Sequence, residues 1–266
     1  MFKIVEHPIR NTWVPLDTTS TPTLYEGQLV KNALGDGIIQ LATATGIGDT
    51  TNLQAISGVI VGFNNRTPVY DATYKRNKLT AVITQAAQVA RDWAGQEGQW
   101  SKGDPQAMAQ IALIGPRTIL EAPLFNGTLG TASTLLTVTT GSTDGLSFTA
   151  NAAQVTPVAD LCTSYCRTGA NAGIMRISDD TSTTAETNDL AFPYDIAIGD
   201  TFIRVPLRPF GKSYVQVDSL AMFFDTAASP VTNYFIIDVL ELRLEVAGQE
   251  SVLFKFHPCH FDSVRA

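Results

Sequence analysis

The stretch YFIIDVLELRLEV, residues 234–246, decides the fold class of this chain. From Leu240 onward, apolar residues at the even positions alternate with charged residues at positions 241, 243 and 245. Successive side chains of a β-strand point to opposite faces, so this period of two predicts an antiparallel strand with one face buried and the other in water. Gly248 and Gln249 predict a turn, after which Ser251–Phe256 would return as a terminal hairpin.

The same period of two continues outward through the chain, and helical spacing of apolar residues is nearly absent. Glycine, proline and Asn/Asp residues separate short β-branched runs, which is typical of an all-β barrel or sandwich. A helix is the alternative only at Asp104–Gln110, where Asp104 would be the N-cap. The other expected strands are Gln28–Lys31, Gly37–Ala42, Ser57–Phe63, Thr67–Asp71, Leu79–Thr84, Gln88–Trp93, Ala109–Ile114, Leu135–Thr140, Leu146–Ala150, Ile174–Ser178, Thr201–Pro206 and Tyr214–Phe224.

A Thr/Ser/Gly tract at residues 126–151 divides the sequence into two unlike halves. Residues 1–121 carry ten basic and ten acidic side chains, whereas residues 122–266 carry eight and fifteen, so the net charge of −7 lies in the second half. Each half is long enough to form a core of its own. The expected parts are an N-terminal arm (1–16), a small β-barrel-like docking domain (17–121), a linker (122–134) and an acidic antiparallel β-sandwich domain (135–266).

The composition argues against several classes of function. The sequence has no run of about 20 apolar residues, so it predicts no membrane span, and the first residues lack the apolar core of a secretion signal. A pI near 4.9 argues against nucleic acid as a partner, because binding to phosphates needs a basic face. Three cysteines cannot pair completely, so we expect reduced thiols in a protein assembled in the cytoplasm.

Two motifs have a ligand-binding interpretation that their context weakens. Gly211-Lys212-Ser213 is similar to the end of a phosphate-binding loop, but Pro206 stands where that loop needs a glycine. Two cysteines four residues apart, together with a Cys/His cluster near the C-terminus, would supply zinc ligands of the right types, but at spacings that match no zinc finger. The alternative for the two cysteines is that they are small apolar core residues. We therefore expect no metal and no cofactor. The residues of this zinc alternative are Cys162, Cys166, His257, Cys259 and His260.

Two charged clusters also have a simpler interpretation than a ligand site. Lys75–Lys78 would touch nucleic acid only with a basic surface around it, so we interpret it as a solvated turn or a contact to an acidic neighbour. The acidic residues Asp179, Asp180, Glu186, Asp189 and Asp195 surround a loop that would hold calcium, but they lack the spacing of an EF-hand. A solvated acidic loop is the simpler interpretation.

No motif predicts catalysis. The chain has three histidines, no Gly-x-Ser-x-Gly elbow, and no pair of carboxylates that stands out as an acid and a base. We expect a protein that is not an enzyme, with a hydrolase on a β scaffold as the remaining catalytic alternative.

The N-terminal residues instead indicate a contact with other chains. Phe2, Ile4 and Trp13 interleave with charges and prolines, which is typical of an arm that pairs with a partner by strand addition. The alternative is an ordinary first strand. Adjacent aromatic residues at positions 223–224 and 234–235 would point to opposite faces of their strands, which indicates subunit packing. The candidate interface residues are Phe2, Ile4, Trp13, Phe223 and Tyr234.

The first half has a recognisable layout of glycine turns and strands. Leu24–Val30 contains a turn with Gly27, Gly37–Ala42 follows as a strand, and Gly58–Gly62 reads Gly-Val-Ile-Val-Gly. Gln99–Pro105 looks like a later turn of the same kind. The layout resembles the small β-barrel modules of tailed-bacteriophage head decoration (cement) proteins and related virion accessory proteins. It covers residues 24–114 at most, and residues 122–266 match no family.

The resemblance implies a structural virion protein that is assembled in the host cytoplasm and located on the capsid surface. Its partners would be the major capsid protein and sister subunits, in a closed homo-oligomer such as a trimer. The neutral half would dock, and the acidic half would face solvent. A small-molecule ligand is not expected. The alternative is a glycan-binding or host-recognition module of a virion, with exposed loops and aromatic residues such as Tyr194 in the second half.

Overall fold

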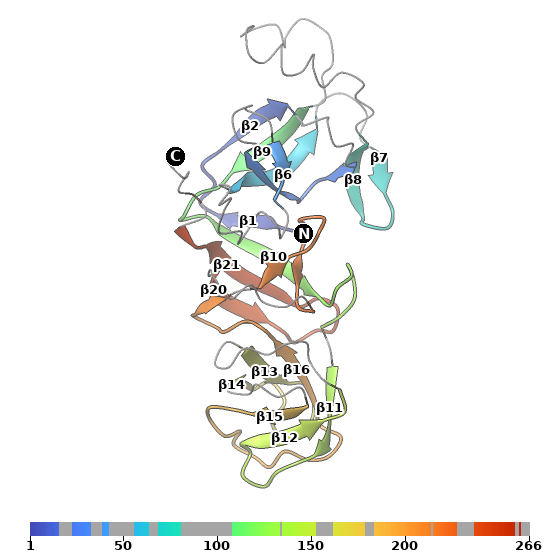
Figure 1. Cartoon of the computed structure of the whole chain (residues 1–266), viewed down its shortest axis with the longest axis vertical. Helices are drawn as coiled ribbons and strands as arrows, with labels where there is room; N and C mark the ends of the chain where they lie inside the picture. The colour runs from blue at the N-terminus through green and yellow to red at the C-terminus, as the bar shows by residue number, and fades with distance from the viewer. Residues whose placement is uncertain are drawn as a thin grey trace, which may run out of the picture. The chain divides into compact units, whose positions relative to one another are not determined.

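The structure of the chain, a computed structural model, consists of β-strands joined by turns and loops (Figure 1). No α-helix occurs among the residues that it describes, so the prediction of an all-β protein is confirmed. Within these same residues, no helix is long and apolar enough to cross a membrane. The described residues are 1–15, 23–32, 39–42, 56–63, 69–80, 108–133, 135–152, 162–178, 184–213, 215–227, 237–258 and 261.

The chain divides into two compact units. The first consists of Met1–Ile119 with Ser219–Met222 and Pro258–Ala266, and the second consists of Leu120–Asp218 with Phe223–His257. The first unit includes residues 219–222 because the side-chain amide of Gln28 donates to the carbonyl of Leu220 (2.7 Å) and the amide of Leu29 donates to that of Ala221 (3.0 Å). The finer division into arm, docking domain, linker and sandwich stays a prediction.

The first unit contains an antiparallel sheet in the order β2-β9-β6-β4-β5. Leu24, Val30, Ile60 and Ile111 form its core, together with Ala109. The strands expected near residues 28, 57 and 109 are confirmed within one residue or two, and Gln88–Trp93 lies outside the described residues. The bounds are β2 (Arg10–Pro15), β4 (Leu29–Asn32), β5 (Ile39–Leu41), β6 (Ile56–Phe63) and β9 (Met108–Leu113), preceded in the chain by β1 (Lys3–Glu6). Of the helix considered at Asp104–Gln110, residues 104–107 lie outside the described residues, and Met108–Gln110 belong to strand β9.

Strands β6 and β9 approach each other closely at Gly58. A Cβ atom at Gly58 would overlap the carbonyl oxygen of Ala112 and lie 2.5 Å from Cγ2 of Ile111. At Gly62, four residues later on the same strand, the nearest atom to such a Cβ would be 3.6 Å away. Only the first of the two glycines is therefore required by packing.

A smaller sheet of the first unit has the order β3-β8-β7, with bounds β3 (Thr23–Tyr25), β7 (Val69–Asp71) and β8 (Arg76–Thr80). The turn between β7 and β8 is fixed by Asp71, whose carboxylate accepts hydrogen bonds from Lys78 (2.7 Å) and from the amides of Thr73 (2.9 Å) and Tyr74 (3.2 Å). The bond from Lys78 is the largest cause that lowers the pKa of Asp71 below its usual value.

The second unit contains a sheet in the order β14-β13-β16-β11-β12-β15. A bridge between Ser178, at the end of β14, and Asn188, just after β15, brings its two outer strands together and nearly closes it into a barrel. The predicted hairpin between Leu135 and Ala150 is confirmed, while β13 has no counterpart among the predicted strands. The bounds are β11 (Leu135–Thr140), β12 (Ser147–Ala150), β13 (Cys162–Cys166), β14 (Met175–Ser178), β15 (Ala185–Thr187) and β16 (Thr201–Val205).

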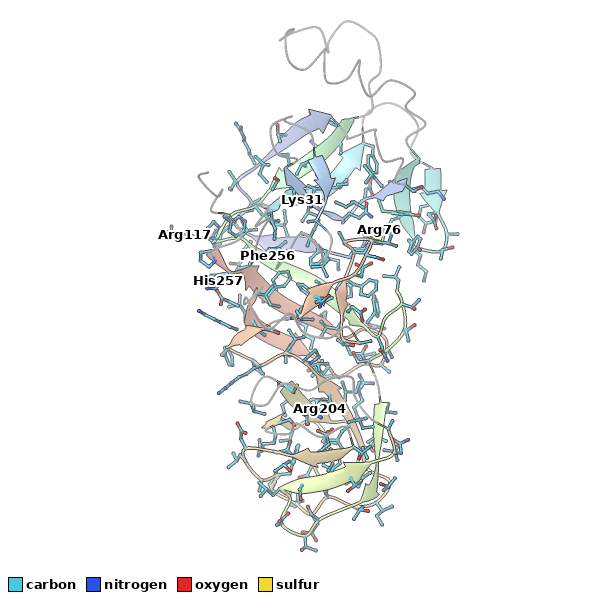
Figure 2. The ribbon with its side chains drawn as sticks, viewed as in Figure 1. Lys31, Arg76, Arg117, Arg204, Phe256 and His257 are labelled. Atoms are coloured by element: carbon cyan, nitrogen blue, oxygen red, sulfur yellow. The ribbon has the colours of Figure 1, made fainter. Side chains whose placement is uncertain are left out.

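An aromatic cluster and a buried ion pair lie inside this nearly closed barrel. Phe202 stacks on Phe148 with ring centroids 4.4 Å apart and meets Phe192 edge-on at 5.5 Å. Arg204, labelled in Figure 2, lies on the same face of β16 as Phe202 and donates to the Glu186 carboxylate at 2.6 Å. Both charged side chains are 0% exposed. The expectation that Glu186 belongs to a solvated acidic loop is therefore wrong, because its carboxylate is the partner of a buried arginine.

The other sheet of the second unit follows the order β17-β20-β21-β10-β19-β18. The terminal hairpin predicted from the alternating stretch is confirmed, as β20 pairs with β21 from Ile237 to Arg243. Strand β10 was hidden in the sequence by Pro123, which pairs with Ser251. The bounds are β10 (Ile119–Phe125), β17 (Lys212–Ser213), β18 (Gln216–Val217), β19 (Phe224–Asp225), β20 (Ile237–Arg243) and β21 (Ser251–Phe256).

The single long strand expected at Tyr214–Phe224 is wrong, and Tyr214 itself lies outside the described residues. The Asp218 carboxylate accepts a hydrogen bond from the amide of Phe223 (2.9 Å), and the Asp218 amide donates to the Phe223 carbonyl (3.0 Å). These two bonds close a loop in which Ala221 has a φ of 54°. The chain therefore reverses between β18 and β19, because a local aspartate hydrogen bond competes with extended backbone.

Candidate docking site

The predicted interface residues lie in different surroundings. Phe2 and Phe223 are buried, at 2% and 3% exposed, so they have little side-chain surface to offer a partner. Ile4 is half-buried, and Trp13 on β2 is 44% exposed. Tyr234 lies outside the described residues. Phe2 and Ile4 line one pocket of the first unit, and Trp13 lies on a strand next in the chain.

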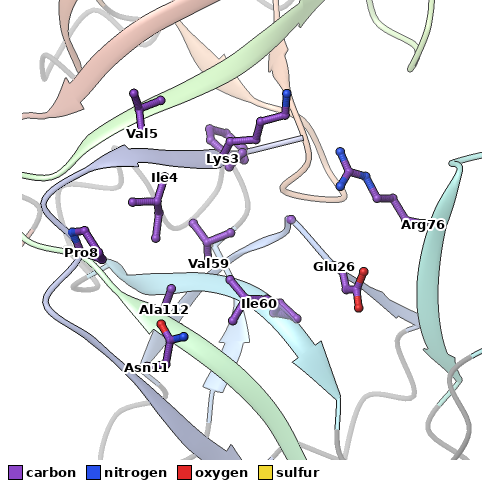
Figure 3. Close-up of a pocket in the computed structure, with 13 residues that line it drawn as sticks. Lys3, Ile4, Val5, Pro8, Asn11, Glu26, Val59, Ile60, Arg76 and Ala112 are labelled. Carbon is purple, nitrogen blue, oxygen red and sulfur yellow. The ribbon is translucent and has the colours of Figure 1, made fainter.

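This pocket has a volume of about 430 Å³, which is within the usual range for ligand sites. Its apolar wall comes from three strands, and Lys3, Glu26 and Arg76 supply its charges. Figure 3 shows the guanidinium of Arg76 pointing from β8 toward the side on which Lys3 lies. The apolar wall consists of Ile4, Val5, Val59, Ile60, Val61 and Ala112.

The turn at Gly27 places the first residues of the chain against this pocket. Gly27 has a φ of 87°, donates its amide to the carbonyl of Ile60 (2.8 Å) and accepts at its own carbonyl from the amide of Phe2 (3.1 Å). A Cβ atom at Gly27 would lie 2.8 Å from Cβ of Met1. A glycine is required there both for its left-handed backbone and for the close approach of the N-terminus.

Among the described residues, the two cations of the pocket have no carboxylate partner. Across the described residues, no Asp or Glu oxygen lies within ion-pair distance of the charged groups of Lys3 or Arg76. Glu26, the acidic residue of the lining, accepts a hydrogen bond from the side-chain amide of Asn77 at 3.0 Å. The pocket therefore combines an apolar wall with two cations that remain available to an anionic partner.

Strand β2 adds an exposed apolar surface. It pairs with β9 from Arg10 to Pro15 and is the terminal strand in the order of its sheet, so its second edge has no strand partner in the part of the chain that the structure describes. Ile9, immediately before the strand, is 63% exposed, and Trp13 is 44% exposed. An edge strand with exposed apolar side chains is a template for pairing with another chain.

The zinc alternative gains no support from the described residues. Cys162 and Cys166 of β13 are buried and form no disulfide, and burial raises the pKa of Cys166 to about 11. Without a bound metal, a thiol with that pKa stays protonated near neutral pH. His257 is described, but Cys259 and His260 are not, and within the described ranges no three His, Cys, Asp or Glu residues form a metal cluster.

The remaining motifs have structural roles where they are described. Lys212 and Ser213 form β17 and pair with β20, so two of the three residues that are similar to a phosphate-binding loop are themselves part of a strand. In the basic cluster, Lys78 pairs with Asp71 at 2.7 Å. Asp179 and Asp180 lie outside the described residues.

A second exposed surface, which the sequence did not single out as a unit, is the loop Leu190–Ile198 of the second unit. Leu190, Tyr194 and Ile198 are 64%, 60% and 75% exposed. Ile196, between the last two, is 2% exposed and joins the core of the barrel. The sequence could not predict which of these residues are exposed, because Ile196 and Ile198 have the same side chain but one is buried and the other is exposed.

Comparison of the chain with models of protein families, with curated proteins and with solved structures finds no match.

Proposed function

We propose that the chain is a structural protein of a tailed-phage virion that binds the capsid surface and stabilises the shell without catalysis. The observation that carries the proposal is the exposed apolar edge of β2, with Ile9 and Trp13, in the same unit as an open pocket with two available cations. A decoration protein acts by burying such surface across the joints between shell subunits, and many symmetric copies multiply a modest contact.

In this proposal the neutral first half, with a barrel-like domain at 17–121, is the docking part, and the acidic sandwich-like domain at 135–266 faces solvent. Like charge on the outward part keeps particles apart. The partners are the major capsid protein and sister subunits in a closed oligomer such as a trimer. The protein is located on the capsid surface after assembly in the host cytoplasm.

The first test is whether purified particles of the virus that encodes the chain contain it in a fixed stoichiometry, measured by quantitative mass spectrometry. A second test is binding of the purified chain to particles that lack it, measured by co-sedimentation. Absence from the particles, together with no binding to them, would overturn the proposal.

Substitutions on β2 connect this test to the structure. Trp13→Ser removes the exposed aromatic side chain, and we expect at least a tenfold loss of occupancy, because tryptophan at the centre of an interface commonly carries much of its free energy. Tyr70→Ser is the matched control, since Tyr70 is an exposed aromatic residue of the same unit (61%) on β7. Point substitutions are cleaner than deletion of the arm, because Arg10–Pro15 is a strand of the sheet.

A glycan-binding module is the second candidate. The observation that favours it is Tyr194, an aromatic side chain 60% exposed next to the exposed carboxylate of Asp195 on a loop tied to the barrel. Aromatic faces and carboxylates are common contacts for sugars. Saturable binding to a glycan array that Tyr194→Ala abolishes would support this function, and no binding to any glycan would remove it.

A further inference from the structure

The pocket of the first unit needs an occupant with a particular chemistry. Its wall is apolar, and Lys3 and Arg76 line it without a carboxylate partner among the described residues. A partner segment that fits must therefore bring an apolar side chain together with a carboxylate. A basic segment fits less well, because the lining has two cations against the one carboxylate of Glu26, and like charges brought together at an interface cost binding free energy.

The second unit carries a segment with that chemistry. The loop that precedes β16 presents Ile198 at 75% exposure and Asp195 as an exposed carboxylate. Residues 189–200 contain no Lys or Arg. Asp195 has no ion-pair partner in the parts of the chain that the structure describes. The loop is thus apolar and acidic, whereas the pocket is apolar and its two cations outnumber the one carboxylate, that of Glu26.

The loop is also held in place before any partner binds. The side-chain amide of Asn171, itself 0% exposed, donates to the carbonyls of Tyr194 (2.9 Å) and Asp195 (3.3 Å), and its oxygen accepts from the amide of Tyr194 (3.1 Å). Ile196 pairs with Ser142 through two backbone hydrogen bonds of 2.9 and 3.0 Å. A preorganised segment loses little conformational entropy on binding, so Ile198 is presented at low cost.

Another exposed apolar residue of the second unit fits the pocket less well. Phe210 is 89% exposed and has a φ of 56° in the turn Arg208–Gly211. It stands between Arg208 and Lys212, which have the same charge sign as Lys3 and Arg76 of the pocket. Charge complementarity therefore selects the loop at 195–198 over the turn at Phe210.

We propose that the pocket lined by Lys3 and Arg76 receives the Asp195–Ile198 loop of a second copy of this chain. The inference rests on the proposed function, since it names sister subunits as the partner of this surface. Pocket and loop are different surfaces of one chain, so the contact is head-to-tail and repeats from copy to copy. It closes into a ring when the rotation between copies permits, and otherwise it forms an open chain.

Charge reversal tests the pairing. Arg76→Glu and Asp195→Arg should each weaken self-association about tenfold, because each places like charges in the contact. The double variant R76E/D195R restores opposite charges and should return within about threefold of the wild-type association constant. The measurement is sedimentation velocity over a range of protein concentrations. Lys3→Glu provides a second pocket variant if Arg76→Glu does not fold, which thermal melting checks.

Matched controls separate the contact from net charge. Arg117→Glu changes the charge of the first unit by the same amount at an exposed residue that does not line the pocket, and Glu245→Arg does so in the second unit. Both should associate like the wild type. A double variant as weak as either single variant, or a wild-type chain that stays monomeric at every concentration, would overturn the inference.

Binding to particles distinguishes this inference from the proposed function. If Arg76→Glu loses capsid binding and keeps self-association, a capsid segment occupies the pocket, so the inference fails and the proposed function stands. If the charge swap restores self-association and the chain is absent from particles, the inference stands and the proposed function fails.

Discussion

Replacing Glu186 with glutamine should destabilise the barrel of the second unit more than any exposed charge substitution in the chain. The Glu186 carboxylate lies 2.6 Å from Nη1 of Arg204, and both side chains are 0% exposed. Nη2 of Arg204 also donates to the hydroxyl of Ser178 at 3.0 Å. The glutamine keeps the shape of the side chain and removes the charge, so the buried guanidinium loses this counterion.

The expected cost is about 3–5 kcal/mol of unfolding free energy, because breaking a buried ion pair leaves one charge without compensation. With a urea m-value of about 2 kcal/mol/M, a loss of about 4 kcal/mol lowers the midpoint of unfolding by about 2 M. In native-state hydrogen exchange, the same loss speeds exchange of the globally protected amides of β13 and β16 by about 10³-fold.

The assay must report on the second unit. All three tryptophans, at positions 13, 93 and 100, precede Leu120, so tryptophan fluorescence does not report on the barrel. Hydrogen exchange measured by mass spectrometry on peptides that cover β13 and β16 does. Glu241→Gln is the matched control. Glu241 pairs with Arg243 at 2.9 Å on the exposed face, where solvent screens the pair, and we expect no measurable change.

The double variant E186L/R204M separates the cost of an unpaired charge from the worth of the pair. Buried pairs replaced by apolar residues of similar size are often neutral or stabilising, so the double variant should recover most or all of the lost stability. A Glu186→Gln variant that exchanges at the wild-type rate would refute the reasoning, because it would mean that the guanidinium reaches water or another anion.

Three further outcomes are expected. Gly58→Ala should cost about 1–3 kcal/mol, because its methyl group overlaps the neighbouring strand, while Gly62→Ala is tolerated; urea unfolding followed by tryptophan fluorescence compares the two. Cys162 and Cys166 should resist iodoacetamide at pH 8 until urea unfolds the chain, as peptide mass spectrometry of the labelled protein will reveal. The folded pKa of Asp71 lies below its unfolded value, so the stability that this carboxylate adds is complete above about pH 4 and is lost as the pH falls through the folded pKa. Asp71→Asn should therefore flatten the stability profile in that acid range, as measured by thermal melting.

The sequence predicts strands best where one face is buried and the other is solvated. The hairpin of β20 and β21 was predicted because the alternation of apolar and charged residues indicates both an extended backbone and which face of the strand is buried. Strand β13 was not predicted, since its burial pattern has no exposed position and Cys-Thr-Ser-Tyr-Cys shows no alternation. Strand β10 was missed because Pro123 reads as a break, although it pairs with Ser251 and the neighbouring Leu124 donates its amide to the carbonyl of Glu250 (2.8 Å).

The candidate site was predictable in part. Gly27 marked a turn, because turn residues are a local feature of the sequence, and the contact surface expected from the apolar N-terminal residues stays a prediction. That Lys3 and Arg76 line the same pocket was not predictable, because 72 residues separate them in the sequence and only folding brings them together. The opposite surroundings of Ile196 and Ile198 also depend on that folding, because burial is set by which strand a side chain meets.

The sequence by itself determined that the described part of the chain is all-β, that its acidic excess lies in the second half, and where most of its alternating strands run. Period, composition and turn residues are local properties, and local physics is enough to select extended backbone. The tertiary structure alone decided that Glu186 is the buried partner of Arg204, that the Asp218 loop interrupts the strand expected there, and that two cations share an apolar pocket. These outcomes depend on distant residues brought together, where burial changes the free energy of a charge far more than its place in the sequence does.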